Sequence, residues 1–241
     1  MNTIIIKNSE LLEPDLYQIQ NKEIVNHIQK VLKLKVGEAL KVCLVNEGIG
    51  TGIIKSLSSA EAIIFLKKKN VLKKRNPWVN LIIGLSRPQT CKKVLELGTS
   101  MGVKSFEFLD AKLSEKSYAQ SKVFQNNAFE KYLLNGLSQS SNLHIMPSLK
   151  VEKSLKKESG EEGEQKLILS PFSEKSLNDI SLDFEKPITV AIGPERGWTG
   201  KEVEKFKSHN FLEVKISSSV LRVETATISV LSQLELLKNK I

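Results

Sequence analysis

From residue 79 onward, short apolar runs alternate with segments of helical periodicity, and this alternation limits the fold more than any other feature of the chain. The apolar runs have the length of buried strands, which we expect at Val79–Leu85, Ser105–Leu109, Leu143–Met146, Leu167–Leu169, Ile188–Ile192 and Leu212–Ile216. Helices are expected at Pro88–Met101, Ser117–Leu137, Gly200–Ser208 and Val223–Lys238. Strands that alternate with helices predict an α/β domain with a mostly parallel sheet.

The first third of the chain has a different pattern. Short β-rich runs predict strands at Ile4–Lys7, Glu38–Val45, Gly50–Leu57 and Glu61–Lys68, with one helix over Asn21–Val31. Several short strands with a single helix are typical of a small β-barrel. The charged stretch from Lys67 to Pro77 has the composition of a linker, so the sequence predicts two domains, residues 1–74 and 75–241.

Composition excludes several classes of protein. No apolar run approaches the ~20 residues that a membrane-spanning helix needs, and Met1–Glu10 lacks the layout of a signal peptide. The two cysteines cannot form a disulfide framework, and the three histidines lack the paired spacing of a zinc site. We therefore expect a cytoplasmic protein with reduced thiols, no membrane partner and no metal.

The charge of the chain is the first positive indication of a partner. The formal net charge is +9, and residues 1–76 carry 13 basic and 7 acidic side chains. A basic domain of this kind is typical of proteins that bind RNA. Only four of the 36 basic residues are arginine, however, and a lysine-rich surface without a nucleic-acid partner would have the same composition. Charge alone leaves both interpretations open.

Two glycine clusters suggest nucleotide-binding loops but lack the required context. The stretch Glu96–Gly102 is similar to the glycine-rich turn of Rossmann-type methyltransferases, which needs a strand before it and a helix after it. Here a helical pattern comes first and a strand follows, so we interpret Gly98 or Gly102 as the end of a helix. The cluster Gly48–Gly52 is followed by a strand pattern, which predicts a hairpin turn.

Two loops in the last third of the chain carry the strongest signal. The strand Ile188–Ile192 runs directly into the glycine-bracketed turn Gly193–Thr199, and the strand Leu212–Ile216 runs into the small residues Ser217–Ser219. A helix is expected after each loop. Open α/β sheets bind ligands at the carboxyl ends of their strands, and glycine lets the backbone approach a ligand closely. Both loops are therefore candidate ligand-binding loops.

These loops carry a family resemblance. The stretches Gly193-Pro194-Glu195-Arg196-Gly197 and Leu221-Arg222-Val223-Glu224-Thr225-Ala226 resemble the Gly-Pro-Glu-Gly-Gly and Leu-Arg-x-Glu-Thr-Ala motifs of the RsmE family of 16S rRNA (uracil-N3) methyltransferases, in the SPOUT superfamily. Upstream, Glu96-Leu97-Gly98 is similar to the family's Glu-Leu-Gly helix, and residues 27–38 are similar to a segment of its PUA-like barrel. The resemblance extends over nearly the whole chain.

The resemblance implies a fold, a cofactor and partners. It implies a PUA-like RNA-binding β-barrel followed by a SPOUT α/β domain with a C-terminal trefoil knot, assembled as a homodimer. It also implies S-adenosylmethionine as cofactor and the 16S rRNA of the small ribosomal subunit as substrate. The positions that match the family's cofactor site are Leu169, Ser170, Ile192, Gly193, Pro194, Glu195, Arg196, Gly197, Ile216, Ser217, Val220, Leu221 and Thr225.

The same resemblance places Arg222 and Glu224 nearest the chemistry. An arginine there would stabilise negative charge that develops on the uracil oxygens, and Glu224 would orient Arg222 or act as a base. Alternatively, the two side chains pair with each other only to fix the loop. In the first domain, Lys30, Lys33 and Lys35 are expected to contact RNA phosphates, which position a substrate without reading its sequence.

Several positions depart from the family pattern. Arg196 replaces a glycine of the first motif, and Ser217 and Ser219 replace a glycine and an arginine that precede the second. These changes leave open an alternative in which the chain is a catalytically weakened or silent RNA-binding relative. A further alternative, a Rossmann-type methyltransferase that uses Glu96–Gly102, would require a strand at Val94–Leu97.

Overall fold

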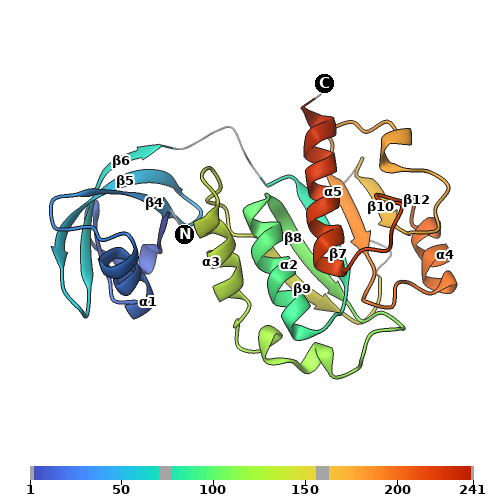
Figure 1. The fold of residues 1–241 in the computed structure, drawn as a ribbon, viewed down its shortest axis with the longest axis horizontal. Coiled ribbons are helices and arrows are strands. Elements are labelled where there is room, and N and C mark those ends of the chain that lie inside the picture. Colours follow the sequence, from blue (N-terminus) through green and yellow to red (C-terminus); the bar gives the residue numbers. More distant parts are fainter. Residues whose placement is uncertain (1–2, 71–76, 156–162, 240–241) are drawn as a thin grey trace. The chain divides into compact units, whose positions relative to one another are not determined.

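The computed structural model describes residues 3–70, 77–155 and 163–239, and the chain divides into two compact units (Figure 1). The first unit comprises residues 1–76 and 134–146, and the second comprises residues 77–133 and 147–241. Our sequence-based division at residue 74 left the segment 134–146 in the second domain. That segment joins the first unit because its Leu137 and Leu143 are buried together with Ile5 and Cys43.

The first unit is built on a curled six-stranded sheet, a half-barrel. Its strands are β1 (Ile4–Ile6), β2 (Leu11–Glu13), β3 (Leu16–Ile19), β4 (Ala39–Leu44), β5 (Gly48–Leu57) and β6 (Ala62–Asn70). They lie in the order β1-β4-β5-β6-β3-β2, in which β1 and β4 are parallel and the other neighbours are antiparallel. The small β-domain expected from the sequence is confirmed as this half-barrel.

Two details of this sheet differ from our expectations. Strands β2 and β3 were not predicted, although the Pro14-Asp15 pair between them is a turn signal and Asp15 has a left-handed φ of 61°. The hairpin turn assigned to Gly48–Gly52 is instead formed by residues 45–47, because Asn46 takes the left-handed conformation (φ 65°) and Gly48 already begins β5.

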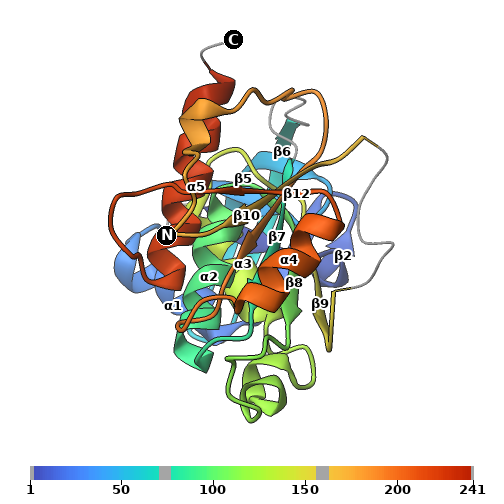
Figure 2. The same ribbon diagram turned by 90° about the vertical axis from the view of Figure 1, so that its right-hand side faces the viewer.

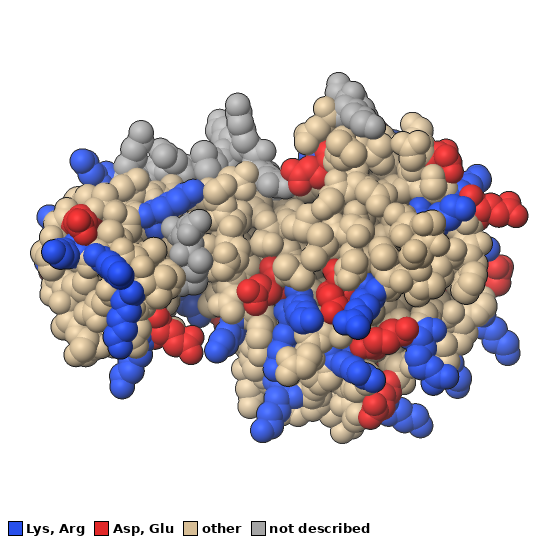
Figure 3. Space-filling model, viewed as in Figure 1, with Lys and Arg blue, Asp and Glu red and all other residues tan. Residues whose placement is uncertain are grey.

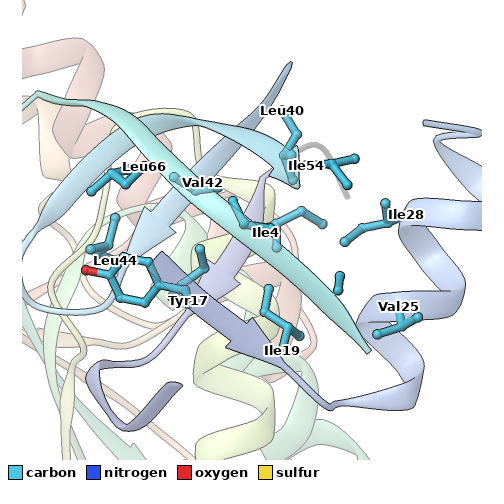
Figure 4. Close-up of a cluster of buried hydrophobic side chains, with 13 residues drawn as sticks. Ile4, Tyr17, Ile19, Val25, Ile28, Leu40, Val42, Leu44, Ile54 and Leu66 are labelled. Carbon is cyan, nitrogen blue, oxygen red and sulfur yellow. The ribbon is translucent and has the colours of Figure 1, made fainter. Parts of the chain in front are cut away.

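A helical segment closes one end of the half-barrel. Helix α1 (Lys22–Asn26) begins at Asn21, whose side chain accepts a hydrogen bond from the backbone N–H of Glu23 at 2.9 Å, and it continues into a π-helical turn, His27–Val31. Val25 and Ile28 are fully buried against the inner face of the sheet (Figure 4). Helical structure over Asn21–Val31 is thus confirmed.

The second unit contains a six-stranded sheet in which every pair of neighbours is parallel. Its strands are β7 (Val79–Gly84), β8 (Val103–Leu109), β9 (Ser148–Glu152), β10 (Gln165–Leu169), β11 (Ile188–Ile192) and β12 (Phe211–Val214). They lie in the order β12-β10-β11-β7-β8-β9. The parallel sheet predicted from the alternating pattern is confirmed.

Helices cover both faces of this sheet. Helix α2 (Pro88–Ser100) packs against α5 (Val223–Lys238) on one side, and α4 (Gly200–Ser208) lies on the other (Figure 2). Phe206 of α4 is buried against Ile82, Ile168 and Ala191 of the sheet. Each of the three helices occupies a segment where the sequence predicts one.

Two expected elements are wrong. The helix predicted over Ser117–Leu137 is two 3₁₀ turns followed by the shorter helix α3 (Glu130–Gln139), because Asn126 and Asn127 both have left-handed φ angles, 48° and 57°. The strand predicted at Leu143–Met146 is irregular, and the strand that pairs with β8 begins at Ser148 instead.

Both cysteines, Cys43 and Cys91, are free and buried. Burial raises the pKa of each thiol to about 12, so neither is a thiolate at neutral pH. Within the described ranges, no helix combines the length and apolar composition that crossing a membrane requires.

Candidate functional site

Three loops meet at the carboxyl edge of the parallel sheet. They follow β10, β11 and β12, which are neighbours, so the ends of the three strands lie side by side. The loops and the helices that follow two of them enclose a cavity of about 550 Å³. All the positions matched above to a cofactor site line this cavity except Thr225, which is exposed on the first turn of α5.

The loop after β11 is a tight turn in which two glycines are required. The N–H of Gly197 donates to the carbonyl of Pro194 at 2.8 Å, and Gly197 has a left-handed φ of 73°. A Cβ at Gly193 would lie 3.0 Å from the Cα of Gly197 across the turn. Gly84, at the end of β7, packs against the same turn, since a Cβ there would lie 2.5 Å from the nitrogen of Pro194.

Arg196 lies within this turn at the position where the family has glycine. Its φ is not left-handed, so an arginine there adds no backbone strain. Its side chain is exposed at the rim of the cavity. Ser217, the other replaced glycine, also has no left-handed φ. Both departures are therefore compatible with an open cavity.

Glu195 fastens the turn to helix α2. Its carboxylate accepts hydrogen bonds from the backbone N–H of Arg87 at 2.8 Å and from the hydroxyl of Thr90 at 3.4 Å. These donors lie at the amino end of α2, where the helix dipole favours a negative charge. The side chain of Glu195 thus braces the loop, and the loop backbone is left to face the cavity.

The loop after β12 is held by side chains of its own unit. The carbonyl of Ile216 accepts a hydrogen bond from the side-chain amide of Gln233 on α5 at 2.9 Å. The hydroxyl of Ser217 accepts one from the N–H of Ser219 at 3.1 Å. The loop ends at Arg222, the N-cap of α5, which is exposed and directly follows the cavity residue Leu221.

Glu224 pairs with Lys93 of α2, at 3.3 Å between Oε1 and Nζ, rather than with Arg222. A hydrogen bond from its own backbone N–H is the largest cause of a lowered pKa of this carboxyl, and Lys93 and Arg222 lower the pKa further. Glu224 is therefore ionised at neutral pH and poorly suited to accept a proton. Lys93 was not among the site residues predicted from the sequence, although it lies one turn before the Glu96-Leu97-Gly98 motif on α2.

Trp198 supplies a buried hydrogen-bond donor at the cavity wall. Its ring packs on Phe206 with the centroids 4.9 Å apart, and within the described part of the chain its indole Nε1 is buried without a partner. A buried donor left unpaired is costly.

Glu213 on β12 also lines the cavity, and its carboxylate interacts with Ser170, after β10, and with Lys207 of α4. The hydroxyl of Ser170 is the largest cause of a lowered pKa of this carboxyl, and Lys207, 2.9 Å away, contributes as well. A carboxyl with a lowered pKa adds stability above its unfolded pKa and loses that contribution as the pH falls through the lowered value.

We expect Glu213→Gln to lower the melting temperature at pH ~7 by about 2–4 °C, the equivalent of no more than ~1 kcal/mol for a partly exposed pair. The difference should shrink as the pH falls and should disappear once the pH is below the lowered pKa of Glu213, because the native carboxyl is then protonated as well. Thermal unfolding of both proteins at pH ~7 and ~3 measures this. An equal difference at the two pH values would contradict the assignment.

The three lysines expected to contact RNA lie in one continuous stretch of the first unit. Lys30 is in the π-helical turn, and Lys33 and Lys35 follow it; all three are exposed. On the face shown in Figure 3, basic side chains are spread over the surface with acidic ones between them rather than gathered in one patch. Among the described residues, no group of three or more His, Cys, Asp or Glu side chains could hold a metal ion.

The Rossmann-type alternative is wrong. Val94–Leu97 is helical, inside α2, and not a strand. A Cβ on Gly98 would lie 2.9 Å from the ring of Phe106, so Gly98 is small because α2 packs closely on β8. Gly102, with a φ of 91°, ends the helical segment as its position suggests.

Comparisons with known proteins agree with this architecture. Residues 73–235 match the family model of an RNA methyltransferase domain, and residues 19–67 match that of an RNA methyltransferase PUA domain. The chain therefore belongs to the RNA methyltransferase family. A relative from Borreliella burgdorferi, ribosomal RNA small subunit methyltransferase E 1, is 34% identical over 213 residues, which cover 84% of this chain and 85% of the relative. The resemblance to the RsmE family is thereby confirmed.

Other relatives and solved structures are similar over most of the chain. Ribosomal RNA small subunit methyltransferase E of Treponema pallidum is 29% identical, over 83% of this chain and 77% of the relative. The Neisseria gonorrhoeae ribosomal RNA small subunit methyltransferase E, solved bound to S-adenosyl methionine, superposes with a TM-score of 0.81 at 19% identity and 98% coverage of both chains. A putative methyltransferase from Legionella pneumophila, solved with the same cofactor, gives a TM-score of 0.79 at 22% identity and 98% coverage of both chains. These structures share the fold.

Proposed function

We propose that the chain transfers a methyl group from S-adenosylmethionine to N3 of a specific uridine in the 16S rRNA of the small ribosomal subunit. The observation that carries this proposal is the cavity at the sheet edge, which the matched motif residues line. The names of the relatives support rRNA as substrate, and the cofactor in the Neisseria structure supports S-adenosylmethionine. Such an enzyme would act in the cytoplasm, where ribosomes are assembled.

The cavity suits that cofactor. The turn Gly193–Gly197 would hold it through backbone groups, and the loop Ile216–Leu221 and residues Leu169 and Ser170 would enclose it. When bound, S-adenosylmethionine supplies a methyl group on an electrophilic sulfonium.

The remaining chemistry belongs to side chains at the start of α5. The reaction breaks a sulfur–methyl bond and forms an N3–methyl bond, and the N3 proton passes to solvent. Arg222 would stabilise the negative charge that develops on the uracil oxygens. Glu224, ionised and paired with Lys93, would act as a positioning residue that fixes the first turn of α5 and with it Arg222. Because N3 lies on the pairing edge, the target base must first be exposed.

Two measurements test the proposal. Isothermal titration with S-adenosylmethionine should show micromolar binding, and the protein should then transfer labelled methyl groups to small ribosomal subunits that lack the modification. Digestion of the rRNA to nucleosides should give 3-methyluridine. Cofactor binding with the label on another nucleoside would contradict the N3 assignment. No binding and no transfer would favour the silent RNA-binding relative.

The homodimer and the knotted path of the last helix are part of the same proposal and follow from the family resemblance. Ile228 and Leu236 of α5 are apolar and partly exposed (36% and 58%), which supports a subunit contact along this helix. Sedimentation equilibrium should give twice the 27.0 kDa mass of the chain.

Lys30, Lys33 and Lys35 would bind phosphates, and their loss should change how RNA binding depends on salt. We expect the triple alanine variant to bind small ribosomal subunits more weakly. The slope of log K against log salt should become shallower by about 0.7–0.9 per lost contact, because fewer counterions are released. Filter binding between ~50 and ~200 mM salt measures this.

The matched control removes Lys112, Lys116 and Lys122, three exposed lysines of the second unit. It changes the net charge by the same amount, so an equal effect in both variants would mean that the first-unit lysines have no special role.

A further inference from the structure

We propose that Phe172 is the platform on which the target base of the RNA stacks during methyl transfer, an inference that rests on the proposed function. Phe172 follows β10, lines the cavity and is 88% exposed. It lies outside the motifs that carry the family resemblance. Isolated apolar residues on a surface are ordinary, so the inference depends on what holds this ring and on what surrounds it.

The backbone around Phe172 is held in place although the ring is exposed. Its N–H donates to the hydroxyl of Ser170 at 3.3 Å. The next residue, Ser173, is buried, and its hydroxyl donates to the carbonyl of Glu213 on β12 at 3.0 Å. The loop is therefore fastened on both sides of Phe172, and the ring is presented to solvent from a fixed base. A pre-positioned ring loses little freedom when a base stacks on it.

The other two loops place complementary groups at the same cavity. Val220, on the loop after β12, is 78% exposed and adds an apolar surface. Arg196, on the loop after β11, is exposed and forms no ion pair with any residue of the described ranges. An aromatic ring together with an unpaired guanidinium suits a nucleotide, whose base stacks while its phosphate accepts hydrogen bonds.

The reaction itself also requires a surface on which the target base can stack beside the cavity. A uridine whose N3 is exposed for methylation has lost its pairing partner and at least part of its stacking in the RNA. An aromatic ring at the mouth of the cavity replaces that stacking and holds the base beside the methyl donor. Phe172 would accordingly act on the RNA substrate and leave the affinity for S-adenosylmethionine unchanged.

The test compares Phe172→Ala, Phe172→Leu and Phe172→Trp with the native protein. We expect the alanine and leucine variants to lose about 5- to 150-fold in kcat/KM for unmodified small ribosomal subunits, the usual effect of one base–aromatic stack. The tryptophan variant should keep most of the activity, because it retains an aromatic face. Titration with S-adenosylmethionine should give a Kd within about twofold for all variants. Leu212→Ala is the control, since Leu212 is another exposed apolar residue of this unit and does not line the cavity.

Three results would overturn the inference and leave the proposed function intact. The first is full activity of both Phe172→Ala and Phe172→Leu, and the second is a loss of cofactor affinity that parallels the loss of activity. The third is dissociation of a dimer in sedimentation, with kcat/KM unchanged at protein concentrations that keep the dimer together. The second would assign the ring to the cofactor site, and the third would assign it to a subunit contact. Failure of the native protein to methylate the subunits at all would defeat the proposed function and this inference together.

Discussion

Replacing Arg222 with alanine should slow methyl transfer to small ribosomal subunits by about 100- to 1,000-fold, the usual cost of removing a donor that stabilises developing negative charge. The affinity for S-adenosylmethionine should stay within about twofold, because Arg222 is not part of the cavity lining. Single-turnover methylation with labelled cofactor, together with isothermal titration, measures the two quantities separately. Arg222→Lys should recover part of the rate, since it restores the charge without the planar guanidinium.

The control is Lys104→Ala, which removes an exposed cation at the opposite, amino-terminal edge of the sheet. It should leave the rate nearly unchanged. If Arg222→Ala keeps its full rate, the role assigned to this arginine is wrong. If it instead loses cofactor binding, Arg222 belongs to the cofactor site and not to the chemistry.

Gly84→Ala should damage both the stability of the second unit and its affinity for the cofactor. The added methyl group would overlap the ring and nitrogen of Pro194, so the turn after β11 must move or the end of β7 must give way. Overpacking of this kind costs about 1–3 kcal/mol of stability. We also expect the affinity for S-adenosylmethionine to fall at least ~10-fold, since the displaced turn is one wall of the cavity. Thermal unfolding and isothermal titration measure the two effects.

Gly200→Ala is the matched glycine control. A Cβ at Gly200, the first residue of α4, meets nothing within 4 Å, so the melting temperature should be nearly unchanged. Gly200 also lines the cavity, so this variant is a control for stability and not for affinity. Should Gly84→Ala bind S-adenosylmethionine as the native protein does, the turn after β11 would not be part of the cofactor site.

Periodicity was enough to predict most of the second unit, because several of its strands are short and apolar and a helix follows each of β7, β11 and β12. The strand Ile188–Ile192 and the helices Gly200–Ser208 and Val223–Lys238 occur with the predicted bounds. The Gly193–Gly197 and Ile216–Leu221 loops were predicted as a site from their place at adjacent strand ends, and both line one cavity. Patterns repeated along a chain are local information, which a sequence carries directly.

What could not be predicted depends on contacts between distant residues or on single backbone angles. The ion pair between Lys93 and Glu224 joins residues 131 positions apart, and no spacing rule connects them. The break in the helix predicted over Ser117–Leu137 depends on two left-handed asparagines, which helical periodicity does not register. The role proposed for Phe172 could not be predicted for a third reason, because the sequence does not show whether a ring is exposed or buried.

The first unit contains residues 134–146, which are synthesised long after residues 1–76, and this affects the order in which the chain folds during synthesis. Leu137 and Leu143 complete the apolar cluster around Ile5 and Cys43, yet the ribosome makes them long after the half-barrel strands. Until then, Ile5 and Cys43 remain uncovered while part of the parallel sheet is already emerging. A fragment that ends at residue 76 would keep this patch exposed permanently and would tend to aggregate, so RNA affinity measured on it would not represent the intact protein.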